Sequence, residues 1–462
     1  MRTAVVLLAL IGVAACSHLP PQPANVAASA QRLQALRLDD PAVSAALNQS
    51  DGAAGQPRWP PASYGLAELL RAAQQLNPAL AESRAQLRAA MAAVSSAHAI
   101  PNPTLGLAFD RYLQEQAGSA RSGWSAALDL PLSAISQRSL QTALADSRVR
   151  AARADYAARY WQLRAELRAG LRDWLLAERQ SRLLQSSLAD QQALAAAYRQ
   201  RLREGAATPA ELQQADLAAL QTQRELSAAA ARAGAARARL AQALGVSIAA
   251  VTGLNFAWPD LEQPAMPPVA QLTPLREQAL LSREDVEHAL ADYDSRELEL
   301  RLQLRAQYPQ LTLGPGYTYD HGIRKLDFNL SLSLPVFNRN AGPIAEAEAR
   351  RAAAGARLEG VQAQVLNEID AALLALQSQL QALAQTRAQT ALAARQLEQT
   401  RTGVAAGADD RIALLNAEVV SFSSQLAELA AIDQAQQSLA ALEDALRVPL
   451  PAAPAAAPGG NP

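Results

Sequence analysis

Cysteine, histidine and aromatic side chains are scarce in this chain of 462 residues, and each shortage excludes a class of protein. The one cysteine, Cys16, can form neither a disulfide bond within the chain nor a cysteine metal cluster. The four histidines show no zinc-like spacing, and neither a glycine-rich phosphate loop nor a Gly-x-Ser-x-Gly nucleophile turn occurs. Aromatic residues make up 4% of the chain, and a formal net charge of −1 provides no basic excess for nucleic acid. The sequence therefore predicts no enzyme, cofactor, metal site or nucleic-acid partner.

Alanine and leucine dominate the apolar half of the composition, which is typical of long helices packed at close range. Apolar residues recur at steps of four, four and three over residues 163–174, and residues 365–383 repeat this rhythm. Such a narrow apolar seam is typical of a coiled coil. Helices are therefore expected over residues 66–99 with a break at Asn77-Pro78, and over residues 137–203, 211–244, 275–306, 344–402 and 412–448.

The plan of the chain occurs twice, about 200 residues apart. Pro103 and Pro309 are 206 positions apart, and Gly205 and Gly407 are 202 positions apart. A unit this long is an internal duplication and not a solenoid repeat. The predicted fold is mainly α with a small β part, built from two helix–hairpin–helix–helix units. The units span residues 63–245 and 275–448, with β-hairpins at 103–132 and 309–336 and an interrupting segment at 246–274.

The second hairpin alternates apolar and polar residues along its last strand. Since neighbouring side chains of a strand point to opposite faces, two faces are predicted. Leu326, Phe328, Leu330, Leu332 and Leu334 share one face, and Asp327, Asn329, Ser331 and Ser333 share the other.

Two structures fit this alternation. The hairpin either packs its leucines on the helices as a soluble protein does, or it crosses a membrane at a tilt. Four strands cannot close a barrel, and lipid does not tolerate an open sheet edge. A membrane-spanning form therefore requires several copies of the chain, and three copies would supply twelve strands.

The first residues indicate export and lipid attachment. A short basic start precedes an apolar run at residues 4–15, which is too short to span a membrane. Residues 13–16 resemble a bacterial lipobox, so residues 1–15 are expected to be a removed signal peptide and Cys16 to be acylated. An ordinary signal peptide with an incidental cysteine is the alternative. Residues 16–62 are expected to form an extended, lipidated tether, and residues 449–462 a flexible tail.

The order of these features resembles the TolC-like family of outer-membrane efflux proteins over about residues 64–448. The resemblance is carried by Pro101–Leu107 (PNPTLGL), by Leu332–Ala349 (LSLPVFNRNAGPIAEAEA) and by the prolines between strand and helix. It implies a lipid-anchored homotrimer in the outer membrane of a Gram-negative bacterium. A 12-stranded β-barrel would continue into a long periplasmic α-helical barrel. The strand–helix junctions would be marked by Pro131, Pro335, Gly342 and Pro343.

The function implied by this resemblance is an exit duct in a tripartite efflux pump. The duct would passively conduct small molecules or ions, with a periplasmic adaptor and an inner-membrane pump as partners. In the barrel, the polar face of the strand would line the lumen and the leucine face would contact outer-membrane lipid.

The helical turns near Gly205 and Gly407 would be the periplasmic tips. Arg203-Glu204-Gly205 followed by Leu212 matches the family pattern more closely than Gly407 followed by Leu414. Asp409 and Asp410 have two expected roles, an acidic ring that narrows the tip or a cap on the final helix.

Two other classes of protein fit parts of the sequence. A structural periplasmic coiled-coil lipoprotein without a channel would account for the helices but not for the strand alternation. An exported enzyme with a helical body would require a polar catalytic cluster. The sequence does not identify the exported cargo.

Overall fold

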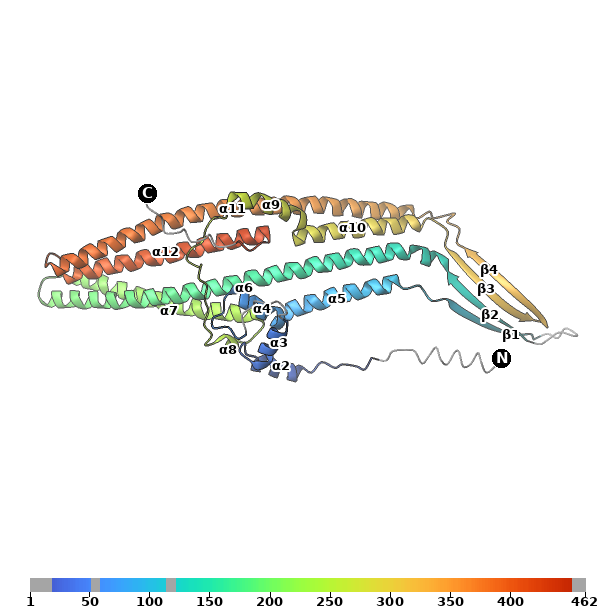
Figure 1. The fold of residues 1–462 in the computed structure, drawn as a ribbon, viewed down its shortest axis with the longest axis horizontal. Coiled ribbons are helices and arrows are strands. Elements are labelled where there is room, and N and C mark those ends of the chain that lie inside the picture. The colour runs from blue at the N-terminus through green and yellow to red at the C-terminus, as the bar shows by residue number, and fades with distance from the viewer. Residues whose placement is uncertain (1–18, 51–58, 114–121, 451–462) are drawn as a thin grey trace.

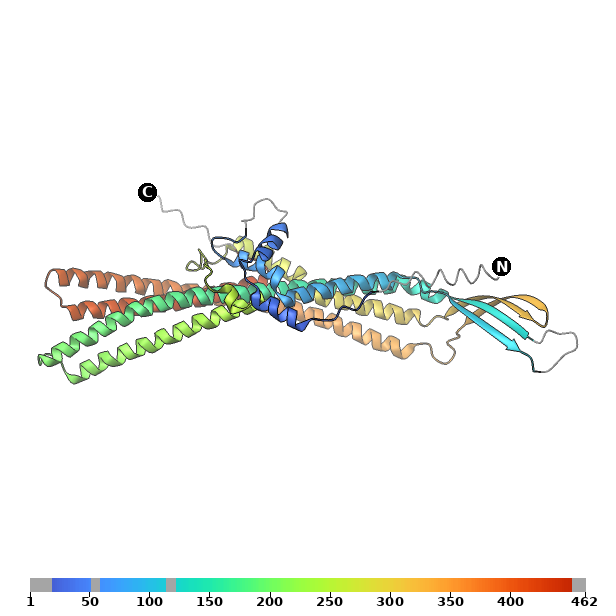
Figure 2. The ribbon, with the colours of Figure 1, turned by 90° about the horizontal axis from the view of Figure 1, so that it is seen from below.

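The computed structural model describes residues 19–50, 59–113 and 122–450. The molecule is elongated, with a four-stranded sheet at one end and the turns of two long helical hairpins at the other (Figure 1). Smaller helices lie at mid-length, where they cover the long helices (Figure 2). The predicted mainly α fold with a small β part is confirmed.

The sheet is made of the two hairpins lying side by side. Its strands are antiparallel and follow the order β1-β2-β3-β4. β2 pairs with β3, with Trp124 opposite Tyr319, so this ladder joins the two halves of the chain. The outer edges of β1 and β4 have no strand partner within the described chain. The strands are β1 (Thr104–Arg111), β2 (Ser122–Pro131), β3 (Leu311–Asp320) and β4 (Ile323–Leu332).

The long helices form one curved layer. At the far end from the sheet, α6 packs against α7 and α12, and α12 packs against α11. Nearer the sheet, α5 and α10 take the places of α7 and α12 beside α6 and α11. These helices are α5 (Pro78–His98), α6 (Leu132–Arg203), α7 (Pro209–Leu244), α10 (Glu284–Arg305), α11 (Ala341–Ala405) and α12 (Arg411–Leu446).

The helix expected over residues 275–306 is in fact two helices, α9 (Val269–Ser282) and α10. The chain is extended at Arg283 between them. This side chain is 4% exposed and donates to the carbonyl oxygen of Ala445, 3.1 Å away. The break therefore depends on a tertiary contact. Helix α9 also begins inside the predicted interrupting segment and contains Pro274.

The expectation of an extended tether over residues 16–62 is wrong for its described part. Residues 26–50 contain two helices, and Leu38, Leu47 and Trp59 are buried. The Trp59 indole Nε1 donates to the carbonyl oxygen of Leu38 at 2.7 Å. We call residues 26–50 and 59–62 the N-terminal strap. It contains α2 (Val26–Ala35) and α3 (Pro41–Ser50), and α3 packs beside α4 (Leu66–Leu76). Residues 1–15, Cys16 and the tail from residue 451 lie outside the described residues.

The duplication is visible in the backbone. The two long turns contain Gly205 and Gly407, with φ of 73° and 74°. Helices α7 and α12 are capped by Thr208 and Asp410, again 202 positions apart, and each side chain accepts from the amide three residues later. Over α6–α7 and α11–α12, positions 202 residues apart are therefore equivalent.

Candidate functional site

The sheet has one apolar and one polar face across all four strands. The register aligns the leucines of β4 with apolar residues of β3, such as Leu330 opposite Leu313, and those of β1 with β2. Eight large side chains of this face are 44–77% exposed, and the leucines of β2 and β3 beside them are half-buried, so the face is not packed in a core. The eight exposed side chains are Leu105, Leu107, Phe109, Trp124, Leu326, Phe328, Leu330 and Leu332.

The opposite face carries small and polar residues. Asp327, Asn329 and Ser331 lie there, opposite Gly316, Gly314 and Thr312 of β3. The hydroxyl of Thr318 donates to Asp327 Oδ2 at 2.5 Å. A Cβ on Gly314 would lie 2.9 Å from Asp129 Oδ1, so glycine makes room for the carboxylate of the neighbouring strand.

The last strand is shorter than predicted. Ser333 and Leu334 were expected in the alternating strand, but β4 ends at Leu332, opposite the first residue of β3. Beyond that point β3 offers no paired residue, although the Ser333 amide still donates to the carbonyl oxygen of Gln310. The prediction was therefore wrong for these two residues because the partner strand determines the end.

The chain passes from sheet to helix at the predicted prolines. Pro131 ends β2 and precedes α6 directly. Pro335 lies in the connection between β4 and α11, and Gly342 and Pro343 lie in the first turn of α11. Proline suits a first helical turn because that turn requires no amide donor. The connection also holds three exposed apolar side chains, Leu334, Val336 and Phe337.

The helical turns hold the predicted tip residues. Gly205 and Gly407 adopt the left-handed conformation that favours glycine, at the ends of α6 and α11. Arg203 is exposed, whereas Leu212 and Leu414 are half-buried one turn into α7 and α12.

Asp410 caps α12 and also binds the neighbouring hairpin. Its Oδ1 accepts from the amide of Ala413 at 2.7 Å, and its Oδ2 lies 2.5 Å from Arg201 Nη2 on α6. The Ala413 amide first, and then Arg201, lower the pKa of this carboxyl. Asp409 is exposed and lies against Gly403. Arg201 was not among the tip residues predicted from the sequence. The only signal for it was that it lies two residues before the predicted tip residue Arg203.

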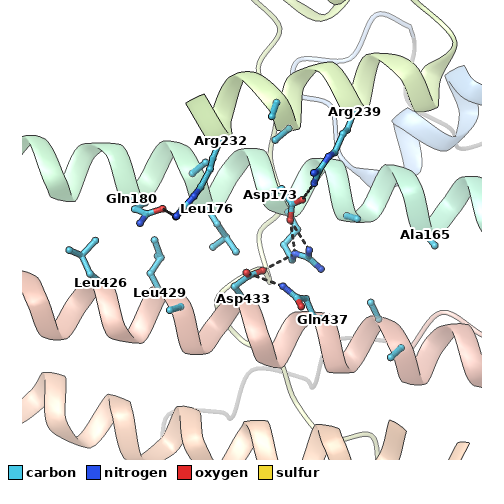
Figure 3. A pocket seen from close by; sticks show the side chains of 18 of the residues that line it. Ala165, Asp173, Leu176, Gln180, Arg232, Arg239, Leu426, Leu429, Asp433 and Gln437 are labelled. Carbon is cyan, nitrogen blue, oxygen red and sulfur yellow. Dashed lines mark hydrogen bonds and ion pairs between the residues drawn. The ribbon is translucent and has the colours of Figure 1, made fainter. Parts of the chain in front are cut away.

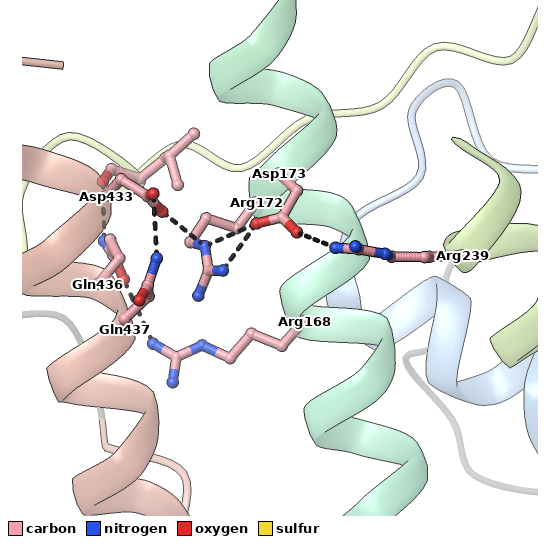
Figure 4. Close-up of polar contacts among 8 residues, drawn as sticks. Arg168, Arg172, Asp173, Arg239, Asp433, Gln436 and Gln437 are labelled. Carbon is pink, nitrogen blue, oxygen red and sulfur yellow. Dashed lines mark hydrogen bonds and ion pairs between the residues drawn. The ribbon is translucent and has the colours of Figure 1, made fainter. Parts of the chain in front are cut away.

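Buried charges join α6 to α12 at mid-length. The Glu443 carboxylate is 2.6 Å from Arg164 Nη2 and 3.1 Å from Arg168 Nη1, and all three residues are less than 7% exposed. One helical turn further on, Arg172 Nε lies 2.9 Å from Asp433 Oδ1. We call these five residues the equatorial charge cluster; Figure 4 shows the part around Arg168 and Arg172.

The equatorial charge cluster is not predicted from the sequence. The available indication was three arginines at steps of four beside the leucine seam of α6. Burial lowers the pKa of Arg168, and the nearby Glu443 carboxylate opposes that shift. The Arg168 guanidinium also lies over the ring of Trp258, 5.4 Å from its centre.

A groove of about 790 Å³ lies beside the cluster, between α6, α7 and α12 (Figure 3). Small side chains such as Ala169 and Ala236 line it. Three of its charged groups are paired with one another, since Asp173 bonds both Arg172 and Arg239, at 2.7 Å and 3.4 Å. This arrangement holds helices together and presents no free nucleophile or base among the groups just named.

Two further properties concern the described part of the chain. No three side chains of the kinds that ligate metals lie together there. In those same residues, no helix has an apolar stretch of the length needed to cross a bilayer.

Comparison with known proteins agrees with this geometry. The model of the outer membrane efflux protein family matches residues 69–246 and 275–446, one match in each half. No curated protein sequence matches the chain significantly.

Several solved structures share the fold. A membrane protein from Pseudomonas aeruginosa is 23% identical with a TM-score of 0.67, and the match covers 85% of this chain and 99% of that one. The outer membrane protein VceC from Vibrio cholerae is 19% identical, with a TM-score of 0.66 and coverage of 82% and 95%. The MtrE outer membrane channel of Neisseria gonorrhoeae, solved in an open state, is 19% identical, with a TM-score of 0.68 and coverage of 83% and 89%.

The family match takes in both helical hairpins, both β-hairpins and the helices between them, which is well over half of the chain. The chain belongs to the outer membrane efflux protein family.

Proposed function

We propose that three copies of this chain form a lipid-anchored exit duct in the outer membrane of a Gram-negative cell. The duct conducts small molecules or ions passively outward from an efflux machine. One observation carries this proposal: an exposed apolar sheet face lies opposite a polar face, and the strands continue into long helices. Such a face is stable in lipid and unfavourable in water.

The requirement for several copies comes from the free edges. β1 and β4 leave backbone groups unpaired at the two sides of the sheet, and lipid does not tolerate that. The layer of long helices also has two free sides, formed by α7 at one side and by α11 at the other. Both carry exposed leucines, Leu217 and Leu220 on α7 and Leu374 and Leu392 on α11. A ring of three copies closes both layers and contains twelve strands.

In this proposal the sheet end of the molecule lies in the outer membrane and the end with the helical turns lies in the periplasm. The leucine face of the sheet contacts lipid, and Asp327, Asn329 and Ser331 line the water-filled lumen. The acyl chain on Cys16 attaches the N-terminal strap to the outer membrane. The turns at Gly205 and Gly407, farthest from the sheet, reach into the periplasm.

At these turns the duct meets a periplasmic adaptor, itself bound to an inner-membrane pump that supplies the energy. The tip is also the gate. The Arg201–Asp410 pair supports this assignment because it bridges the two hairpins of one chain near the end farthest from the sheet.

Reconstitution tests the function directly. The detergent-purified protein should insert into planar bilayers as a trimer and give discrete conductance steps. A chain that stays monomeric and dissolves in water without detergent, once its acyl group is removed, overturns the proposal. Residues 310–336 should also resist protease in outer-membrane vesicles, whereas a purely structural lipoprotein would leave them accessible.

A further inference from the structure

The apolar face of the sheet carries two charged side chains, and both are arginines near the end farthest from the helices (Figure 1). Arg111 is the last residue of β1, and Arg324 is the second residue of β4, opposite Tyr319. Since side chains alternate along a strand, Arg111 shares its face with Phe109, and Arg324 shares its face with Leu326. The other residues of this face in the four strands are uncharged. Positive charge is therefore confined to one end of the apolar face.

The polar face has acidic groups at the same end. Asp110 and Asp320 lie there, and Lys325 of that face holds its Nζ 3.8 Å from Asp320 Oδ2. The Asp320 carboxylate also accepts from the hydroxyl of Tyr112. The carboxylates and their partners thus gather on one face of the sheet, and the arginines lie on the other. A strand end that only faces water does not require the two signs to be sorted in this way.

Neither arginine has an anionic partner among the described residues. Both are exposed, and within that part of the chain no hydrogen bond or ion pair holds either guanidinium. Exposed arginines of the helices do form pairs, as Arg350 does with Glu346. A guanidinium is always charged and carries five donors, so Arg111 and Arg324 present unused donors to whatever lies outside the sheet.

Aromatic side chains lie beside the arginines on the same face. The rings of Trp124 and Tyr317 are 5.2 Å apart. Tyr319 lies between Trp124 and Arg324 in the register of the sheet. Tryptophan and tyrosine favour the level at which lipid tails meet headgroups. Long arginine side chains at this level, and one row beyond it at Arg111, reach outward to the headgroups.

In the proposed ring the two arginines occur at the same border between copies. They lie on β1 and β4, the edge strands of the sheet, at the same end of each. When three copies close the barrel, β4 of one copy borders β1 of the next, so each border has one Arg324 and one Arg111. Like charges across neighbouring strands repel each other. A phosphate between the two guanidinium groups would remove that repulsion, because arginine binds phosphate with paired hydrogen bonds.

We propose that Arg111 and Arg324 bind the phosphate groups of a phosphorylated glycolipid in the outer leaflet. This inference rests on the proposed duct, since that orientation places the strand turns outside the cell. The ligand is a lipid because the arginines continue the apolar face, and a molecule that covers this face needs acyl chains. Two arginines at each border fit a headgroup with two phosphates better than the single phosphate of a phospholipid. The bound glycolipid also bridges neighbouring copies.

Lipid binding to the purified full chain tests this assignment. Native mass spectrometry in detergent counts the molecules of diphosphorylated lipid A that stay on the trimer. Arg111→Gln and Arg324→Gln should each weaken binding about fivefold, which is the contribution of one basic residue at an anionic lipid surface. The double variant should weaken binding at least tenfold. Phosphatidylglycerol, with one phosphate, should bind the parent trimer at least tenfold more weakly than lipid A does.

The matched control is Arg339→Gln. Arg339 is an exposed arginine at the opposite end of the sheet, in the connection between β4 and α11, and its loss should leave lipid A binding unchanged. Conductance in planar bilayers shows that each variant is folded.

Three results with a conducting trimer overturn the glycolipid assignment and leave the proposed duct standing. The first is equal lipid A binding by the parent and the double variant. The second is an equal loss of binding in Arg339→Gln, and the third is equal binding of phosphatidylglycerol and lipid A. A chain that stays monomeric and gives no conductance overturns the duct, and this inference with it.

Discussion

Single residues explain where the two halves of the chain differ. Helix α7 ends at Gly245, where a Cβ would lie 2.5 Å from Pro78 Cδ. Its equivalent at the end of α12, Arg447, is also left-handed, with φ of 54°. Glu284 is the first residue of α10, as Pro78 is the first residue of α5. The Glu284 carboxylate lies 2.6 Å from Arg447 Nε. An ion pair thus accompanies a conformation that costs a non-glycine residue about 1–2 kcal/mol.

Removal of the Glu443 charge should destabilise the chain strongly. Glu443→Gln leaves Arg164 and Arg168 buried without a carboxylate, and breaking such a group costs about 3–5 kcal/mol. Denaturant unfolding of the detergent-solubilised protein measures this loss. Glu346→Gln, which breaks an exposed pair with Arg350, should change stability by less than about 1 kcal/mol. Equal effects of the two substitutions would contradict a buried role for Glu443.

The stability of the first turn of α12 should depend on pH through the Asp410 carboxyl. The Ala413 amide and Arg201 lower the pKa of this carboxyl in the folded state. Its stabilising contribution is therefore complete above the unfolded pKa of about 3.9 and is lost as the pH falls through the lower, folded pKa. Hydrogen exchange at the amides of residues 411–414 should accelerate below about pH 4, relative to intrinsic rates. Asp410→Asn retains a capping oxygen, and it should lack this acid-induced acceleration. An identical acid response in that variant would rule out Asp410 as the cause.

At the scale of elements, local pattern was sufficient for most of the fold. The heptad-like seams predicted α6, α7, α11 and α12 to within about five residues, because packing and helix period agree there. The break at Arg283 and the end of β4 at Leu332 depend on contacts with distant residues. The N-terminal strap was missed because its Pro- and Gln-rich composition shows no period, although Leu38, Leu47 and Trp59 anchor it. The equatorial charge cluster required knowledge of which helices meet.

The two faces of β4 should respond oppositely to a positive charge. Phe328→Arg places a guanidinium on the apolar face in the middle of the strand, which costs about 2–4 kcal/mol in lipid. Asn329→Arg, one residue further, places the same group on the polar face and should be tolerated. The amount of folded trimer in outer-membrane fractions measures the difference. Comparable yields of both variants would mean that the apolar face does not contact lipid.

At the scale of the whole molecule, the charges divide the proposed ring into two kinds of contact. Inside one chain, the two hairpins are joined by the equatorial charge cluster and by the Arg201–Asp410 pair. On the free sides of α7 and α11 the equivalent positions carry no such network, since Leu374 and Ala231 stand for Arg172 and Asp433. Asp370, the equivalent of Arg168, binds Arg276 of its own chain at 3.0 Å. A ring built this way keeps each chain as one unit, while the contacts between chains lack the equivalents of the ion pairs that join its two hairpins.

The gate assignment makes a prediction about conductance that a double-mutant cycle can test. Asp410→Asn and Arg201→Gln each remove the ion pair, and asparagine keeps the cap on α12. The pair is half-exposed, so its loss is worth at most about 1 kcal/mol, or about a fivefold shift toward the open tip per chain. Bilayer recordings should show each single variant conducting more often than the parent, and the double variant no more than either single one. Additive increases would mean that the two side chains act separately. No increase in any variant would place the gate elsewhere along the duct.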